Sequence, residues 1–235
     1  MRRVGVIAAM PGELKPLVDG WQPLTVARKG EAAWVSRVQD VECVAVYAGV
    51  GSEAAARACD IAAKSGVLDA LFSVGWAGAL SCGIHPGSAY AVNEVVDART
   101  EETFVTNFPV HQEIGVPFKL VTTDHIVHYA EKRQLAGLHQ ALLVDMEAAT
   151  VARFARSRQI PFYCLKAISD EISDILPDFG RYTAPNGRLH VPALLAHVAF
   201  RPKYWPAMLR LGQNAKSGAR AVAGALAPLM TSQEK

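Results

Sequence analysis

Four carboxylates follow directly on apolar stretches of the chain, at positions where open α/β proteins commonly carry out chemistry. They are Glu13, Asp145, Glu147 and Asp170. An acid in apolar surroundings can hold or release a proton near neutral pH, and a carboxylate can accept hydrogen bonds from both hydroxyls of a ribose diol. The pattern indicates acid and base chemistry on a small, hydroxyl-bearing ligand. Taken singly, Glu13 also suits the first turn of a helix, and Asp170 suits a helix N-cap.

Two stretches of small residues follow other apolar runs. The turn 49–52, with Ser52 predicted as the N-cap of the next helix, can present backbone N–H groups to an anion or a ribose. It lacks the lysine of a P-loop and the third glycine of a dinucleotide-binding turn. The small residues of 75–78 let the backbone approach a ligand closely, and Trp76 among them either contacts a base or an apolar tail or packs in the core.

Apolar runs rich in β-branched residues recur without strict alternation, which is typical of strands covered by helices on both faces. The predicted strands span 4–9, 43–47, 71–74, 89–96, 120–122, 142–144 and 162–168. The clearest predicted helices span 52–64, 147–158 and 203–229. This alternation predicts a single α/β domain over 1–235, with a mainly parallel, twisted sheet and a C-terminal helical segment over 200–230. The polar stretch 173–192 is predicted to be a lid or binding loop.

The composition argues against several classes of function. Lys and Arg total 24 and Asp and Glu total 22, so the net charge of +2 gives no field that would recruit nucleic acid. The four cysteines show no CxxC spacing and are predicted to be reduced thiols. The first apolar run ends at Pro11, too early for a signal peptide or a membrane span. We therefore expect a cytoplasmic protein with a small-molecule substrate.

Five motifs, in this order along the chain, together resemble one family. They are IAAMPGE, AGVGS, GWAGAL, VDMEAA and AISD. The set resembles the purine nucleoside phosphorylase and uridine phosphorylase superfamily, and within it the methylthioadenosine/S-adenosylhomocysteine nucleosidases. The resemblance implies a three-layer α/β/α fold around a mixed, mainly parallel sheet, and hydrolysis of the N-glycosidic bond of a 5′-substituted adenosine to release adenine. It further implies a homodimer, with no metal and no cofactor.

The resemblance also assigns roles to individual residues. It implies that Glu13 activates the attacking water, that Glu147 binds the ribose diol above Met146, and that Asp170, beside Ser169, protonates N7 of the leaving base. The catalytic residues are thus predicted to be Glu13 and Asp170. The predicted substrate-binding residues are Met10, Trp76, Ala77, Gly78, Ile126, Asp145, Met146, Glu147 and Ser169.

The chain departs from the nucleosidase pattern at two pocket positions. Trp76 stands where these enzymes usually have serine, and Ile126 ends a segment, 123–126, that usually ends in an aromatic residue supporting the base. These departures and the C-terminal basic, apolar helix look like the hopanoid-associated phosphorylases, which are thought to remove adenine from an adenosylated polycyclic lipid. That activity is the alternative prediction, and the segment 200–205 is a candidate for contact with a membrane or an apolar substrate.

Other activities fit the residues less well. A phosphorylase needs cations for its phosphate, and Arg28, Lys29 and Arg57 are the candidates, but Glu13 would repel an anion. A nicotinamide-dependent dehydrogenase would need GxGxxG where this chain has AAMPGE. A catalytically silent nucleoside-binding protein would have no need of Glu13. His125 and His128 could bind a metal only with a third ligand, which the sequence nearby does not offer.

Overall fold

The computed structural model describes residues 2–26, 28–109, 118–174, 176–184 and 187–231. The strands are β1 (Arg2–Ala8), β2 (Gln22–Leu24), β3 (Ala32–Val38), β4 (Val41–Tyr47), β5 (Ala70–Ala79), β6 (Ala89–Val92), β7 (Glu94–Asp97), β8 (Thr103–Val105), β9 (Lys119–Thr122), β10 (Leu143–Asp145) and β11 (Phe162–Asp170). The α-helices are α1 (Pro11–Leu14), α2 (Ser52–Lys64), α3 (Tyr129–His139), α4 (Ala148–Ser157), α5 (Val191–Ala199) and α6 (Trp205–Thr231). Two short 3-10 helices are η1 (Phe179–Tyr182) and η2 (Pro202–Tyr204).

The described strands join in one mixed sheet, as predicted. Its centre is parallel, in the order β4, β1, β5 and β11, and antiparallel partners extend both sides. The long strand β5 holds the sheet together, because it pairs with β11 along one edge and with β1 and then β10 along the other. Consequently the ends of β1, β10 and β11 meet around the last residues of β5.

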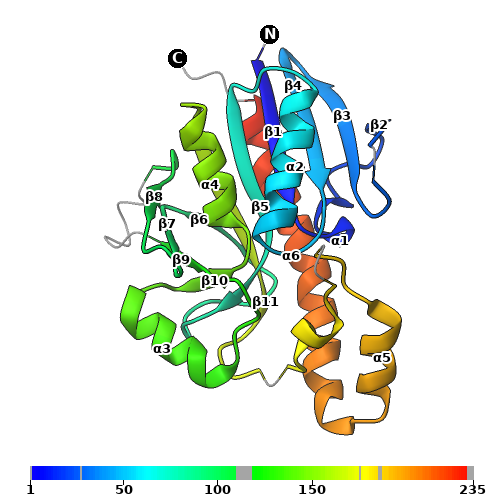
Figure 1. Ribbon diagram of the computed structural model, residues 1–235, viewed down its shortest axis with the longest axis vertical. Coiled ribbons are helices and arrows are strands. Elements are labelled where there is room, and N and C mark those ends of the chain that lie inside the picture. Colours follow the sequence, from blue (N-terminus) through cyan, green and yellow to red (C-terminus); the bar gives the residue numbers. More distant parts are fainter. Residues whose placement is uncertain (1, 27, 110–117, 175, 185–186, 232–235) are drawn as a thin grey trace.

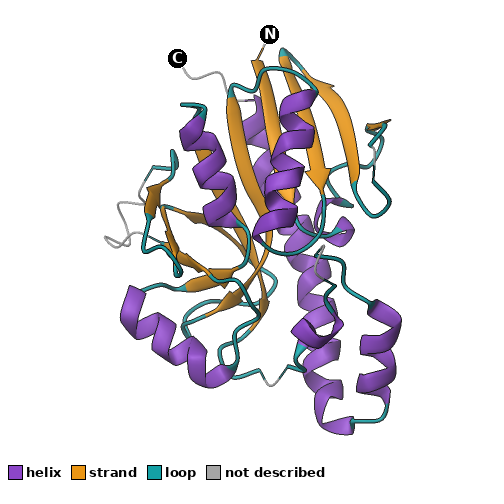
Figure 2. Ribbon diagram, viewed as in Figure 1, coloured by secondary structure: helices purple, strands orange, loops and turns teal. Residues whose placement is uncertain are grey.

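Helices cover both faces of the parallel centre, which gives the predicted three layers (Figures 1 and 2). Helices α2 and α4 pack on one face, and the long α6 crosses the other against β11 and β5. Successive residues of β4 are buried on alternate sides: Val44 and Val46 face one apolar core, and Cys43 and Ala45 face the second. Burial on both faces explains why these strands show no alternation of polar and apolar residues.

The structure corrects several predicted boundaries. The predicted strand 89–96 is two strands, β6 and β7, because at Asn93 the chain leaves β11 and joins β9. The backbone N–H of Asn93 donates to Phe118 O at 2.8 Å, and its side-chain oxygen accepts from Phe118 N at 2.9 Å. The strands β2, β3 and β8 and the helices α3 and α5 were not predicted, because they are short or lie at the edge of the fold.

The predicted C-terminal helical segment is present as α6, which η2 precedes. Beyond the sheet, α6 runs alongside α5 and forms a helical hairpin (Figure 1). The aromatic residues at its tip are exposed: Phe200 is 85% exposed and Trp205 is 49% exposed. Their contact with a membrane stays a prediction. Within the described residues, none of the helices combines the length and hydropathy that a bilayer-spanning helix requires.

Shortening a side chain of α6 that packs on the sheet should destabilise the fold. Leu226 is fully buried in the core that α6 shares with β1 and β5, so Leu226→Ala should lower the free energy of unfolding by about 2–5 kcal/mol. Leu209→Ala on the same helix is the matched control, because Leu209 is 69% exposed and its loss should change stability by less than about 0.5 kcal/mol. Urea titration measures both, and equal effects would show that α6 does not pack as described.

Candidate functional site

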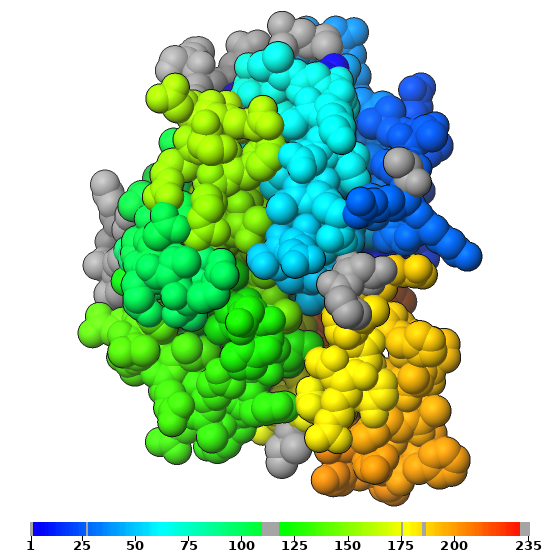
Figure 3. All heavy atoms as spheres, viewed as in Figure 1, coloured from blue at the N-terminus to red at the C-terminus, as the bar shows by residue number. Residues whose placement is uncertain are grey.

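One cavity of about 380 Å³ lies where β1, β10 and β11 end beside β5. Its inner half is formed by the strand ends and the turns that follow them, and it carries the carboxylates. Its outer half is formed by η1, α5 and α6 and is almost entirely apolar. In the space-filling view, the α3 region (green) and the η1 to α6 region (yellow and orange) form the two sides of this lower part of the molecule (Figure 3).

Glu13 is held by three backbone N–H groups at the inner end of the cavity. Its Oε2 accepts from Ala9 and Met10, and its Oε1 accepts from Trp76, each at 2.7 Å. Burial raises the pKa of Glu13, while these backbone hydrogen bonds and the charge of Lys166 oppose the shift. The short helix α1 and the backbone of β5 thus fix one carboxylate in a single orientation.

A glycine in β5 lets the Glu13 carboxylate lie this close to the strand backbone. Gly75 has φ +130°, and a Cβ built on it would lie 2.4 Å from Glu13 Oε1. A side chain at this position would therefore displace the carboxylate.

Glu147 also lines the cavity, and it is the N-cap residue of α4. Its Oε1 accepts from Gly51 N at 2.7 Å and its Oε2 from Met146 N at 3.3 Å. Burial, followed by the charge of Asp145, raises the pKa of Glu147 to about 8, against the opposing charge of Lys166. The prediction that Ser52 is the N-cap of α2 is wrong: Gly51 takes that position with φ +90°, and its N–H is bound to Glu147.

Asp145 borders the cavity, but its carboxylate is bound within the protein. Its Oδ1 accepts from Thr122 Oγ1 at 2.7 Å, and its Oδ2 accepts from Ala148 N at 3.0 Å and forms an ion pair with Lys166 Nζ at 2.9 Å. The side chain is fully buried. Burial alone would lower the pKa of Lys166, but the charge of Asp145 raises it above its usual value. In this structure, the Asp145 carboxylate holds Thr122, Lys166 and the first residue of α4 in place.

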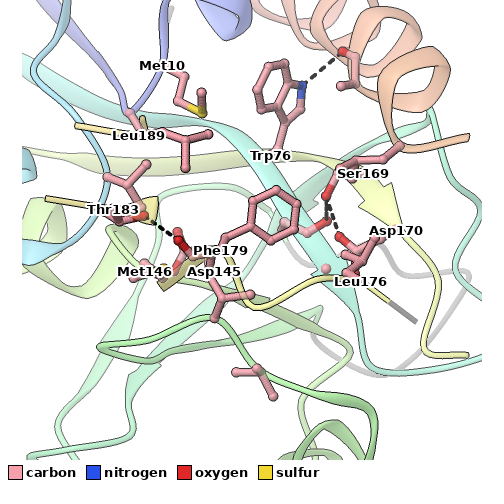
Figure 4. Close-up of a pocket in the computed structure, with 18 of the residues that line it drawn as sticks. Met10, Trp76, Asp145, Met146, Ser169, Asp170, Leu176, Phe179, Thr183 and Leu189 are labelled. Atoms are coloured by element: carbon pink, nitrogen blue, oxygen red, sulfur yellow. Dashed lines mark hydrogen bonds between the residues drawn. The ribbon is translucent and has the colours of Figure 1, made fainter. Parts of the chain in front are cut away.

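Asp170 ends β11 and receives hydrogen bonds on both carboxylate oxygens. Ser169 Oγ donates to Oδ1 at 2.6 Å, and Lys132 Nζ donates to Oδ2 at 2.5 Å (Figure 4 shows the Ser169 contact). Ser169 also lies within 3.2 Å of Ala77 O, which ties this end of β11 to β5. Asp170 is the last residue of a strand, so the alternative reading as a helix N-cap is wrong.

The outer half of the cavity comes from segments that lie late in the chain. Phe179 and Leu189 point into the cavity, and Trp76 faces them with its indole N–H bound to Ala215 O at 2.9 Å (Figure 4). Trp76 therefore both packs against α6 and lines the cavity, and its contact with a base or an apolar tail stays a prediction. The predicted binding loop 173–192 contributes to this lining, although its residues 175, 185 and 186 lie outside the described residues. The apolar lining from α5 and α6 is Val191, Leu194, Leu195, Met208, Leu211 and Ala215.

All of the predicted site residues border this one cavity. They are Met10, Glu13, Trp76, Ala77, Gly78, Ile126, Asp145, Met146, Glu147, Ser169 and Asp170. The predicted anion ligands do not: Arg57 binds Glu31 at 3.0 Å, and Arg28 lies with it at a separate hollow. Lys29 is exposed. His125 binds Asp124 and Glu131 through its two ring nitrogens, each at 2.7 Å, and does not converge with His128 on a third ligand among the described residues.

Two lysines at the site were missed by sequence reasoning. Lys132 lies on α3 and Lys166 lies within β11, and both are at least 97% buried. The signal for Lys166 was a lysine inside a strand predicted to be covered on both faces, where an unpaired charge would be costly. For Lys132 the sequence offers no comparable signal, because a lysine on a short polar helix is usually solvated.

The fold and the set of acids define a protein of the phosphorylase superfamily. The model of that superfamily matches residues 3–133 and 120–185, so the chain belongs to it.

Among particular proteins, the chain is 23% identical over 203 residues to the 5′-methylthioadenosine/S-adenosylhomocysteine nucleosidase of Buchnera aphidicola, covering 74% of this chain and 79% of that one. Its fold is similar to that of a Helicobacter pylori nucleosidase crystallised with 5′-methylthioadenosine in the active site, with a TM-score of 0.71, 15% identity and 98% of each chain covered. It is also similar to the futalosine hydrolase of H. pylori, with a TM-score of 0.69, 16% identity, and 98% and 97% of the two chains covered.

The raised pKa of Glu147 should appear in the pH dependence of stability. Between about pH 4.5 and 8 the folded protein holds a proton on Glu147 that the unfolded chain releases, so this group lowers the free energy of unfolding as the pH rises through that window. Glu147→Gln cannot titrate and should gain stability relative to the wild type over the same window. Urea titrations at several pH values measure the difference.

Glu53→Gln serves as the control, because Glu53 is exposed in the first turn of α2. A difference between wild type and Glu147→Gln that stays constant from pH 4.5 to 8 would contradict the raised pKa.

Proposed function

We propose that the protein hydrolyses the N-glycosidic bond of a 5′-substituted purine nucleoside of the methylthioadenosine type and releases adenine. The observation that carries this proposal is that Glu13, Glu147 and Asp170, from three separate strand ends, border one cavity. The membership of the superfamily and the nucleosidase relative support it. The cavity volume of about 380 Å³ is in the range of small-molecule sites.

Glu13 has the geometry of a base that activates water. A carboxylate offers about four acceptor positions, and the backbone N–H groups of Ala9, Met10 and Trp76 occupy three. One position remains for a water hydrogen. Because the backbone holds the carboxylate in place, the water it binds would be oriented toward the anomeric carbon before the bond breaks.

Glu147 and Met146 suit the sugar. The Glu147 carboxylate is anchored by Gly51 N on one oxygen and faces the cavity between the turn that begins α2 and the end of β10. A ribose diol can donate both hydroxyls to such a carboxylate, and binding of two donors would favour its ionised form. Met146 offers an apolar surface beside it.

Asp170 and Ser169 suit the base. Breaking the glycosidic bond leaves its electron pair on the purine, so a proton delivered at N7 lowers the barrier. Asp170 also borders the polar half of the cavity, and Ser169 fixes the orientation of its carboxylate. Nucleophile activation, sugar binding and departure of the base are thereby assigned to three different acids.

Hydrolysis is favoured over phosphorolysis by the charges at the cavity. A phosphate dianion needs several cationic or N–H donors, and Arg is the usual choice. Among the described lining residues the basic side chains are Lys132, which is paired with Asp170, and His125, which is bound to Asp124 and Glu131. The N–H groups that could hold an anion near β1 are bound to Glu13 instead.

The proposal predicts adenine release from 5′-methylthioadenosine at the same rate with and without phosphate, followed by chromatography. Glu13→Gln should lower kcat by about 10²- to 10⁴-fold, because the amide cannot take a proton from water. Glu53→Gln, which removes an exposed carboxylate, should leave the rate unchanged. A strict requirement for phosphate would rule out the hydrolase, and an unchanged rate for Glu13→Gln would rule out the role of that acid.

The second candidate substrate is an adenosine with a large apolar 5′ group, as in the hopanoid-associated enzymes. The outer half of the cavity favours it, because α5 and α6 line it with aliphatic side chains such as Leu194, Met208 and Leu211. Leu195 both lines the cavity and is 55% exposed, so the apolar lining continues to the protein surface. A long substituent could therefore extend from the sugar along the hairpin.

A series of 5′-alkylthioadenosines tests this second candidate. If the outer half binds the substituent, KM should fall severalfold for each added CH2 group that becomes buried, at about 0.8 kcal/mol per group. Leu211→Gln should raise KM for long chains and leave the methyl compound unaffected. Leu209→Gln, two residues along the same helix and exposed, is the matched control. A KM independent of chain length would restrict the substrate to a small 5′ group.

A further inference from the structure

Lys132 is an unusual residue for its helix. Helix α3 is polar and mostly exposed, and its buried residues are Lys132 and His139. Lys132 is only 3% exposed, although a lysine on such a helix would normally extend into solvent. Burying an ammonium group costs free energy unless it is paired, so the fold directs this side chain inward against its ordinary preference.

The side chain of Lys132 contacts Asp170 directly. Its Nζ lies 2.5 Å from Asp170 Oδ2 and donates to Glu171 O at 2.9 Å. An ammonium group has three donor hydrogens, and these two contacts use two of them. A Cβ built on Gly78 would lie 3.4 Å from Nζ, and Lys132 is itself part of the cavity lining. The lysine therefore stands next to the carboxylate, at the edge of the substrate space.

This pairing changes the chemistry expected of Asp170. Both of its oxygens accept hydrogen bonds, from Ser169 Oγ and from Lys132 Nζ, and an ammonium group can only donate, so both oxygens act as acceptors here. A carboxylate without a proton cannot by itself act as an acid. The nearest proton reserve that the described structure provides is the ammonium group 2.5 Å away.

We propose that Lys132 supplies the proton that Asp170 delivers to the leaving base. This inference rests on the proposed nucleosidase function and adds a residue to it. Lys132 acts through Asp170, and its short contact with Oδ2 gives the proton a direct path. The second contact, to Glu171 O, holds Nζ in position while the charge moves.

The transfer balances in charge and atoms. As the C–N bond breaks, its electron pair passes to the purine. The base takes a proton from Asp170, and Lys132 gives one proton to Asp170, so the purine leaves neutral and the lysine becomes a neutral amine. The attacking water gives its proton to Glu13 and its oxygen to the sugar. Exchange with solvent after product release restores the ammonium of Lys132 and the carboxylate of Glu13.

The test compares two leaving groups on the same 5′-substituted ribose. Adenine needs a proton in order to leave, whereas 4-nitrophenolate is stable as an anion and does not. Lys132→Met should lower kcat for adenine release by about 10²- to 10⁴-fold. It should change kcat for the nitrophenyl riboside by less than about threefold. Asp170→Asn should show the same pattern, because it interrupts the same path. Lys64→Met, at an exposed lysine, is the control for loss of a positive charge.

Lys132→Arg separates proton supply from simple charge pairing. A guanidinium keeps the positive charge but does not release its proton in proteins, so proton supply requires that this variant also lose adenine release. Recovery of adenine release in Lys132→Arg would overturn the proposal. Equal losses on both leaving groups would overturn it too, since they would indicate a structural role.

Thermal melting identifies variants that do not fold, and for these the comparison is repeated with Lys132→Gln. If the wild type cleaves neither compound, the proposed function itself fails. If the wild type cleaves both compounds and Lys132→Met slows both equally, the proposed function stands and only the role of Lys132 fails.

Discussion

The buried ammonium group of Lys166 is the charge on which the inner half of the cavity depends. It forms an ion pair with Asp145 at 2.9 Å, and its charge also acts on Glu13 and Glu147. Three carboxylates this deeply buried would repel one another and lose hydration, so without a cation among them the site would be very unstable. The lysine belongs to β11, the strand that also ends in Asp170, so one strand supplies both the balancing charge and the acid.

Close backbone contacts determine how the acids are oriented. Glu13 and Glu147 are each held by an N–H group from a segment distant in sequence, Trp76 in β5 and Gly51 before α2. At Gly75 a side chain would collide with the Glu13 carboxylate, and at Gly51 the positive φ of +90° favours glycine. The N–H groups of Gly51 and Trp76 are therefore occupied within the protein. Both bind the protein's own carboxylates.

The C-terminal helix α6 packs on the sheet and also lines the outer half of the cavity. Near its middle, α6 lies close to β11: a Cβ on Gly218 would be 2.6 Å from Ala167 Cβ. The same helix continues past the sheet, binds the indole of Trp76 through Ala215 and lines the outer cavity. Polar chemistry is thus built on the rigid strand ends, while the apolar part that would meet a 5′ substituent is built on a hairpin.

The sequence by itself determined the α/β class, the central strands and the acids, because apolar runs and the acids that follow them are local features. It could not show the partners of those acids. The structure shows that Asp145 is paired with Lys166 and Asp170 with Lys132, while the substrate contacts predicted for both acids stay predictions. These pairs join residues 21 and 38 positions apart. Only tertiary structure decided them, because the cost of burying a charge depends on which opposite charge the fold places beside it.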